Sequence, residues 1–305
     1  RSFHQKIGRR MRALVQMIGS ESAVASCLHD SKKIIAPAAT YPFLLAKIAE
    51  KSSLLIVTSS SRSAEDLASE LRELHNRVLE FPAWETLPHE RLSPRSDTVA
   101  RRLATLSTLA RKDLENPIVV APIRAAIHRF IADLATAPLQ TLEIGGEVDL
   151  TSLVEHLTQL AYTRTDLVEK RGEFAVRGGI VDLFLPLSNH PIRIDFFGDE
   201  IEDLSYFEVA DQRTFAPVVG SVEIYPCREM LLTPEVKHRA IEVKDTYPAA
   251  AEMLEKISEG IAFEGMESLI PLLIDETETL LSRMPANTQI VFIDEQRIRS
   301  RAADL

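Results

Sequence analysis

The chain has 305 residues, of which 45% are hydrophobic and 26% are charged, and this length exceeds one ordinary domain of about 100–200 residues. The composition therefore predicts a soluble globular protein of two or three domains and excludes a disordered or fibrous chain. The longest charge-free apolar stretch, Ile34 to Ala46, has 13 residues and two prolines, whereas a membrane helix needs about 20. Cys27 and Cys227 lie too far apart in sequence to suggest a disulfide scaffold or a zinc site, so we expect a reducing cytoplasm.

The charge is distributed unevenly along the chain. Residues 1–142 contain 20 Lys/Arg and 14 Asp/Glu, which gives a net charge of +6. Residues 143–305 contain 15 Lys/Arg and 31 Asp/Glu, a net charge of −16, so the whole chain has a net charge of −10. The acidic part divides into −9 for residues 143–221 and −7 for residues 222–305. A phosphate backbone would be repelled by this part, and the first part lacks the clustered basic footprint of a nucleic-acid binder. We therefore expect a protein partner first.

Residues 1–142 alternate in type between apolar runs and amphipathic segments. Phe3 to Ile18 has helical spacing, with a basic face at Lys6, Arg9, Arg10 and Arg12. Strands are expected at Lys33–Ala36, Leu54–Thr58, Val78–Phe81 and Ile118–Ala121. Helices are expected at Phe43–Ala49, at Ser63–Leu74 with a capping box of Ser63 and Asp66, at about Asp97–Ala110 and around Ile123–Ile131. Short buried strands between helices predict a parallel sheet covered on both faces.

The first strand-to-helix turn of such a lobe is the usual place for the phosphates of a nucleotide. Here the turn comprises Ala36, Pro37, Ala38, Ala39 and Thr40, followed by Tyr41 and Pro42. It has neither the glycines nor the lysine of a P-loop, and its prolines remove N–H donors. The sequence therefore predicts a nucleotide-type lobe that does not hold ATP in the usual way.

Residues 143–221 have a different pattern, which predicts an antiparallel meander with one helix. The helix is expected from about Leu150 to Ala161, with Asp149 as its N-cap. The strands are expected at Phe174–Val176, Ile180–Leu185, Ile192–Phe197 and Ile201–Phe207.

One strand of the meander suggests a binding surface. In Ile192–Phe197 the period of two places Arg193, Asp195 and Phe197 on the face opposite the apolar set. Arginine beside an exposed aromatic residue is typical of interface hot spots. In the alternative interpretation, Phe197 packs under a neighbouring loop and Arg193 pairs with Asp195. Arg177 precedes a Gly-Gly turn and is expected near the same surface.

Residues 222–305 predict a small α/β lobe without chemistry of its own. Thr233 and Pro234 form a strong helix start, another helix covers Ala249–Glu259, and a strand at Gln289–Ile293 precedes a helix capped by Asp294. The carboxylates of this lobe have mixed spacing and no partner histidine, so we expect a solvated face. In the whole chain we predict no catalytic residue and no metal site, and Trp84 is expected to anchor its loop to the core.

Several segments together resemble the amino-terminal region of the bacterial transcription-repair coupling factor (Mfd) family. They are RGEFAVRGGIVDLF at residues 171–184, PIRIDFFGDE at 191–200, FEVADQR at 207–213, WETLP at 84–88 and AYTR at 161–164. The resemblance runs from about residue 34 to the end of the chain.

The resemblance implies a module similar to the repair helicase subunit UvrB. Residues 1–142 would be a degenerate RecA-like parallel-sheet lobe without a P-loop, residues 143–221 an inserted α+β antiparallel UvrA-binding domain, and residues 222–305 a small, truncated α/β lobe. The family's UvrA contacts match Arg177, Arg193 and Phe197. ATP, magnesium, RNA polymerase and duplex DNA belong to other parts of the family's full-length proteins, and no membrane is involved.

The function implied is recruitment of UvrA to stalled transcription complexes in nucleotide excision repair, without ATPase activity in these residues. Two alternatives stay open. The first is a UvrB-type helicase lobe, for which the P-loop is the missing feature. The second is a DNA-binding lobe that uses the basic helix from Lys6 to Arg12 together with Arg101 and Arg102.

Overall fold

The computed structural model describes residues 15, 17, 33–87, 90–111 and 114–304. The expected helix from Phe3 to Ile18, with its basic face, lies outside these residues apart from two positions. The chain divides into two compact units, residues 1–83, 105–129 and 278–305 in the first and residues 84–104 and 130–277 in the second. Each unit is described by itself.

The first unit is built on a parallel sheet with the strand order β14-β1-β3-β2. Its elements in chain order are η1 (Ala38–Thr40), α3 (Tyr41–Ile48), β1 (Leu54–Thr58), α4 (Ser61–Arg72), β2 (Val78–Glu80), β3 (Ile118–Pro122), α6 (Ile123–Ile127), α11 (Leu280–Arg283), β14 (Gln289–Phe292) and α12 (Glu295–Ala303). Helix α5 (Ser96–Arg111) runs through the boundary between the units. Every residue of β1 and β3 is buried, as the continuous apolar runs predict for a sheet covered on both faces.

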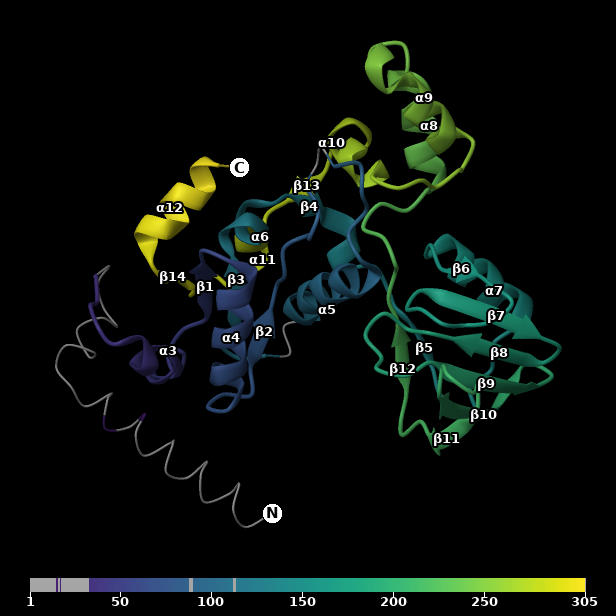
Figure 1. Ribbon diagram of the computed structural model, residues 1–305, viewed down its shortest axis with the longest axis horizontal. Helices are drawn as coiled ribbons and strands as arrows, with labels where there is room; N and C mark the ends of the chain where they lie inside the picture. Colours follow the sequence, from purple (N-terminus) through teal and green to yellow (C-terminus); the bar gives the residue numbers. More distant parts are fainter. Residues whose placement is uncertain (1–14, 16, 18–32, 88–89, 112–113, 305) are drawn as a thin grey trace. The chain divides into compact units, whose positions relative to one another are not determined.

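Helices α3 and α4 cover one face of this sheet, and Figure 1 shows α4 against the strands. Leu45 of α3 and Leu67 of α4 belong to the same buried cluster as Ile56 of β1 and Val120 of β3. The apolar faces of the two helices therefore pack against the strands. The helix start was predicted wrongly at one point. The N-cap of α4 is Ser60, whose hydroxyl accepts a hydrogen bond from the backbone N–H of Ser63, so Ser63 lies inside the helix and does not cap it.

Two further predictions for this unit need correction. Lys33–Ala36 forms no strand, because Ile34 and Ile35 are exposed and the segment joins no sheet of the described chain. The predicted lobe of residues 222–305 is not a compact unit by itself. Its last part joins the first unit because β14 pairs with β1, from Leu54 opposite Gln289 to Val57 opposite Phe292.

The second unit contains an antiparallel meander in a sheet of the order β11-β10-β9-β8-β7-β6, where only β6 pairs in parallel. Its strands and helices are β4 (Phe130–Ile131), η2 (Ala132–Ala135), β5 (Gln140–Leu142), α7 (Leu150–Gln159), β6 (Thr163–Arg164), β7 (Glu173–Arg177), β8 (Ile180–Leu183), β9 (Ile192–Phe197), β10 (Glu200–Phe207), β11 (Thr214–Pro217), β12 (Val222–Ile224), α8 (Pro234–Val243), η3 (Pro248–Ala250), α9 (Ala251–Ser258), η4 (Met266–Leu269), α10 (Ile270–Leu273) and β13 (Thr277–Glu278). Asp149 caps α7 and Thr233 caps α8, as predicted.

One face of the meander carries the core of the second unit. Leu153 and Leu157 of α7 are fully buried together with Phe174, Ile192 and Ile194 of the strands. Burial of one such side chain contributes about 1.5–3 kcal/mol to the free energy of folding. Alternate residues of each strand therefore point into this core. The residues between them point to the opposite face of the sheet.

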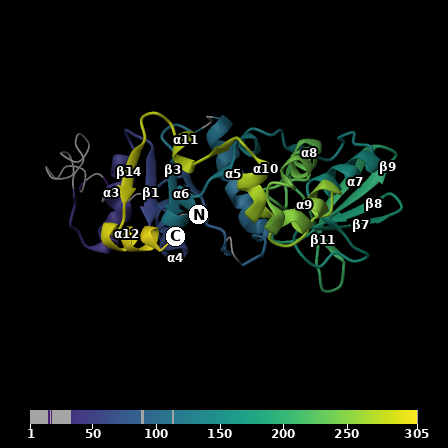
Figure 2. The same ribbon diagram turned by 90° about the horizontal axis from the view of Figure 1, so that it is seen from above.

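A second core forms around helices α8, α9 and α10 and includes Trp84. Helices α8 and α9 lie side by side in both views (Figures 1 and 2). The indole of Trp84 donates a 2.9 Å hydrogen bond to Glu229 Oε1, and the guanidinium of Arg102 pairs with the same buried carboxylate. Trp84 therefore anchors its loop, as predicted.

A sharp turn at Gly265 closes this second core against the segment at Arg91. Gly265 has a φ of +80°, and an added Cβ would lie 2.4 Å from the backbone carbon of Arg91. The adjacent Ser93 hydroxyl accepts a hydrogen bond from the N–H of Gly265 and donates one to Glu267. The turn thus requires both a left-handed backbone and the absence of a side chain.

We expect Gly265→Ala to lower the free energy of unfolding by about 3 kcal/mol, because it adds a backbone clash to the left-handed strain. Gly145→Ala is the matched control, since Gly145 has a φ of +79° and nothing within 4 Å of an added Cβ. The control should lose only about 1 kcal/mol. Denaturant unfolding of both variants measures the difference, and equal losses would show that the contact with Arg91 does not matter.

Candidate protein-interaction surface

The outward face of the meander begins at the hairpin between β7 and β8. Gly178 and Gly179 form the whole connection, because Arg177 pairs directly with Ile180. Gly178 has a φ of +62°, and an added Cβ on Gly179 would lie 3.2 Å from the carbonyl oxygen of Phe196. The N–H of Phe196 donates to the Gly179 carbonyl at 2.9 Å. The two glycines therefore hold the hairpin tip close to β9 and fix the place of Arg177.

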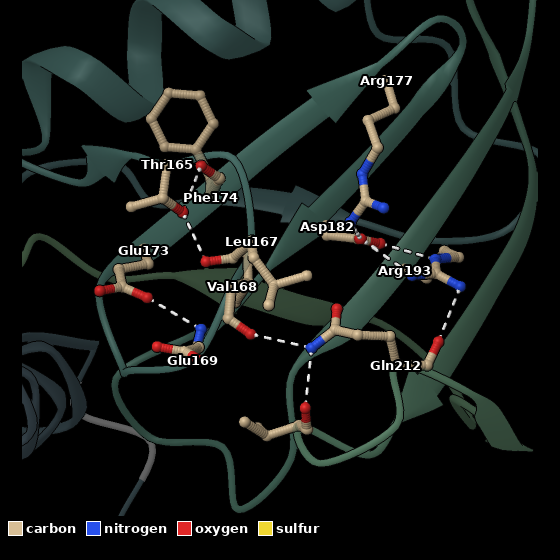
Figure 3. A network of polar contacts seen from close by, with 11 residues as sticks. Thr165, Leu167, Val168, Glu169, Glu173, Phe174, Arg177, Asp182, Arg193 and Gln212 are labelled. Carbon is tan, nitrogen blue, oxygen red and sulfur yellow. Dashed lines mark hydrogen bonds and ion pairs between the residues drawn. The ribbon is translucent and has the colours of Figure 1, made fainter.

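A buried carboxylate lies at the centre of this face. Asp182 of β8 is 1% exposed and stands opposite Arg193 in the register of β8 and β9. It accepts hydrogen bonds from Nε and Nη2 of Arg193 at 2.6 and 2.9 Å. It also accepts one from Nη2 of Arg177 at 2.7 Å (Figure 3). One buried anion thus holds both predicted arginines.

Arg193 is fixed by more than Asp182. Its Nη1 donates to the carbonyl of Gln212 at 3.2 Å, and its guanidinium carbon lies 4.9 Å from the centroid of the Phe207 ring. The hydrogen bonds with Asp182 raise the pKa of the Arg193 guanidinium, so the group stays charged at neutral pH. The side chain of Arg193 is 20% exposed, whereas that of Arg177 is 50% exposed.

Phe197, the aromatic residue of the predicted site, does not pack into the core of its unit. Phe197 is 77% exposed at the end of β9, and Gly198, with a φ of +65°, turns the chain into β10. The sheet register places Arg177 level with Ile180 and Asp195, midway along β9 between Arg193 and Phe197. All three predicted residues therefore lie on one face of three neighbouring strands.

The structure corrects the alternative interpretation of this strand. Phe197 does not pack under a loop, and Arg193 pairs with Asp182 in place of Asp195. Asp182 was missed, although a lone aspartate alternating with Val181 and Leu183 in an apolar strand is a usable signal. A charge at such a position is almost always paired. Gln212 was missed as well, and its sequence context offers no comparable signal.

Two carboxylates face each other beside the arginines. Asp195 stands opposite Asp203 of β10, and like charges in directly opposed positions destabilise a sheet. Burial raises the pKa of Asp195, and the charge of Asp203 raises it further, while Arg193 opposes the shift. The folded state therefore binds a proton at Asp195 more tightly than the unfolded state does. Asp195 therefore lowers the free energy of unfolding as the pH rises from about 4 through its raised pKa.

The turn at the P-loop position also has a defined geometry. Residues 36 and 37 lead into η1, and α3 follows with Pro42 in its first turn. Both the N–H and the hydroxyl of Thr40 bond to the carbonyl of Pro37. Lys47 pairs with Glu50 at 2.6 Å. This arrangement does not fit a triphosphate, because Pro37 has no N–H, the N–H of Thr40 is bonded within the turn, and Lys47 is paired with Glu50.

Other candidate sites can be assessed within the described residues. Arg102, proposed for the DNA-binding alternative, is 1% exposed and paired with Glu229, so it does not face a duplex. The thiol of Cys227 is buried, which raises its pKa to about 12. Cys27 and the basic residues from Lys6 to Arg12 lie outside the described part. Among the residues described, no His, Cys, Asp and Glu cluster is arranged for a metal, and no helix could span a membrane.

We expect Asp195→Asn to raise the melting temperature of the chain at pH 7, because it removes the repulsion with Asp203. The gain should vanish near pH 3, because the raised pKa of Asp195 leaves this carboxyl neutral there in the folded state and the repulsion is absent. Glu202→Gln is the control, since it removes the same charge from an exposed position of β10. Thermal unfolding at the two pH values tests this, and a gain that persists at pH 3 contradicts it.

Residues 141–230 match a family model described as the UvrB interaction domain. The chain is 41% identical over 292 residues to the transcription-repair-coupling factor of Mycobacterium tuberculosis (strain CDC 1551 / Oshkosh), covering 90% of this chain and 24% of that protein. It is 32% identical over 273 residues to that of Myxococcus xanthus, covering 82% and 22%. It is 31% identical over 263 residues to that of Escherichia coli (strain K12), covering 81% and 22%.

The chain thus spans about a quarter of the length of the curated relatives that it matches. The family model covers the whole six-stranded sheet, which carries Arg177, Arg193 and Phe197. The similarity to the relatives extends well beyond that sheet, over most of the chain. The family indicated by the sequence motifs is therefore confirmed: the chain is similar to the transcription-repair-coupling factors, and its residues 141–230 belong to the UvrB interaction domain family.

Proposed function

We propose that this chain recruits UvrA through the surface formed by Arg177, Arg193 and Phe197, and thereby brings nucleotide excision repair to stalled transcription complexes. The observation that carries the proposal is the pairing of both arginines with the buried Asp182, close to an exposed phenylalanine. Fixed arginines and exposed aromatic side chains are the usual anchors of protein interfaces.

The charge of the second unit supports a specific contact over bulk attraction. Residues 143–221 have a net charge of −9, yet the proposed contacts are two arginines and a phenylalanine. A partner drawn by net charge alone would be basic and would avoid these arginines. The surface therefore suits a partner that offers acceptors to Arg177 and an apolar pocket to Phe197.

The first unit has a supporting role in this proposal. Its parallel sheet and flanking helices are consistent with a RecA-like lobe that has lost its P-loop, so this chain would have no ATPase activity. ATP-driven translocation on duplex DNA, and displacement of RNA polymerase, would belong to the parts of the full-length relatives that the chain does not span. The cytoplasm is the compartment for such a repair protein.

We expect Phe197→Ala and Arg177→Ala each to weaken UvrA binding at least tenfold, because each removes an interface anchor. Phe215→Ala is the control, since Phe215 is a second exposed phenylalanine of the same sheet, on the edge strand β11. The control should stay within twofold of the parent chain. Isothermal titration with purified UvrA measures the affinities, and parent-like binding of both anchor variants would overturn the site assignment.

The two alternatives have a direct test on the same chain. We expect no saturable binding of Mg-ATP in a titration up to millimolar nucleotide, because the turn at residues 36–40 offers no phosphate cradle. We also expect no salt-dependent duplex binding at low ionic strength, since Arg102 is buried. Saturable ATP binding would revive the UvrB-type helicase lobe, and salt-dependent DNA binding would revive the DNA-binding lobe.

A further inference from the structure

We infer that Asp182 is the positioning residue of the UvrA surface, acting through the two arginines and not by touching the partner. This inference rests on the proposed function. Asp182 is 1% exposed, so its carboxylate cannot itself reach a bound protein. It nevertheless accepts three hydrogen bonds, two from Arg193 and one from Arg177.

The benefit of this arrangement is preorganisation. An arginine has several rotatable bonds, and a partner that must fix them pays in lost side-chain entropy. Asp182 stands between β7 and β9 at the register position opposite Arg193, so one carboxylate can hold arginines from both neighbouring strands. The guanidinium groups are therefore held in place before the partner arrives, and the rotamer freedom is lost during folding.

The two arginines are held to different degrees. The contacts of Arg193 engage three of its five N–H groups, namely two on Asp182 and one on the carbonyl of Gln212 (Figure 3). Gln212 in turn donates from Nε2 to the carbonyls of Val168 at 3.3 Å and Val209 at 2.9 Å. Arg193 is thus bonded to the loop of residues 208–213, and the side chain of Gln212 in this loop is bonded to the segment at Val168. Arg177 bonds to Asp182 through a single nitrogen, and its side chain is 50% exposed.

This difference predicts opposite responses to lysine, which carries the same charge but cannot form the fork of an arginine. Arg177→Lys can keep its single ion pair with Asp182 and should bind UvrA within threefold of the parent chain. Arg193→Lys loses the bidentate contact and the bond to Gln212, so its affinity should fall at least tenfold. Equal effects of the two substitutions would contradict the proposal.

The decisive variant is Asp182→Asn, measured by titration of the full chain with UvrA. Loss of one negative charge beside two arginines would strengthen binding of acceptor groups if only electrostatics mattered. Positioning predicts the opposite, at least a tenfold loss of affinity. An unchanged or tighter complex would overturn the role of Asp182 and leave the proposed function intact, whereas a parent chain that does not bind UvrA would overturn the proposed function itself.

Destabilisation needs its own control, because Asp182 is buried. Val181→Ala removes a buried apolar group from the adjacent position of the same strand, on the face that packs against α7. This variant should lose stability and still bind UvrA within twofold. If Val181→Ala weakens binding as much as Asp182→Asn, the positioning role is excluded. If Asp182→Asn does not fold, the comparison of Arg177→Lys with Arg193→Lys still decides, since both keep Asp182 paired with a cation.

Discussion

The surface of the second unit depends on a single buried anion with two cationic neighbours. Removing a carboxylate from water costs several kcal/mol, and the pairing with Arg193 and Arg177 offsets that cost only while the geometry is held. The same unit buries a second carboxylate, Glu229, between Trp84 and Arg102. The ion pairs of Asp182 order a surface, whereas the contacts of Glu229 join the loop at Trp84 to helix α5. In both places a buried carboxylate is stabilised by a paired arginine.

The glycines between β7 and β8 show why the hairpin tip and the carboxylate must be considered together. Gly179 allows the hairpin tip to approach β9 within hydrogen-bond distance, and this approach brings Arg177 and Arg193 to opposite sides of Asp182. A side chain at Gly179 would push the strands apart at the point where the arginines converge. The arrangement of the surface therefore follows from backbone sterics as much as from charge.

Much of this structure could be predicted from the sequence, because local patterns determine it. The alternation in Ile192–Phe197 placed Arg193 and Phe197 outward, and Asp149 and Thr233 cap helices as their residue types indicate. The predictions that were wrong concern residues whose surroundings depend on tertiary contacts. The partner of Arg193 is set by the register between two strands, the exposure of Ile35 by the lack of a neighbouring strand, and the burial of Arg102 by Glu229, which is 127 positions away.

The pairing of β1 with β14 affects how the first unit folds during synthesis. Leu54 lies opposite Gln289, so the two strands are separated by 235 positions along the chain. Contacts of such high sequence separation form late and slowly, because the entropy of closing the loop is lost before the contact is gained. On a ribosome, β1 would leave the exit tunnel long before its neighbour is synthesised. During that time the edge of β1 that later receives β14 is open, and an unpaired strand edge of this kind can pair with a strand of another chain.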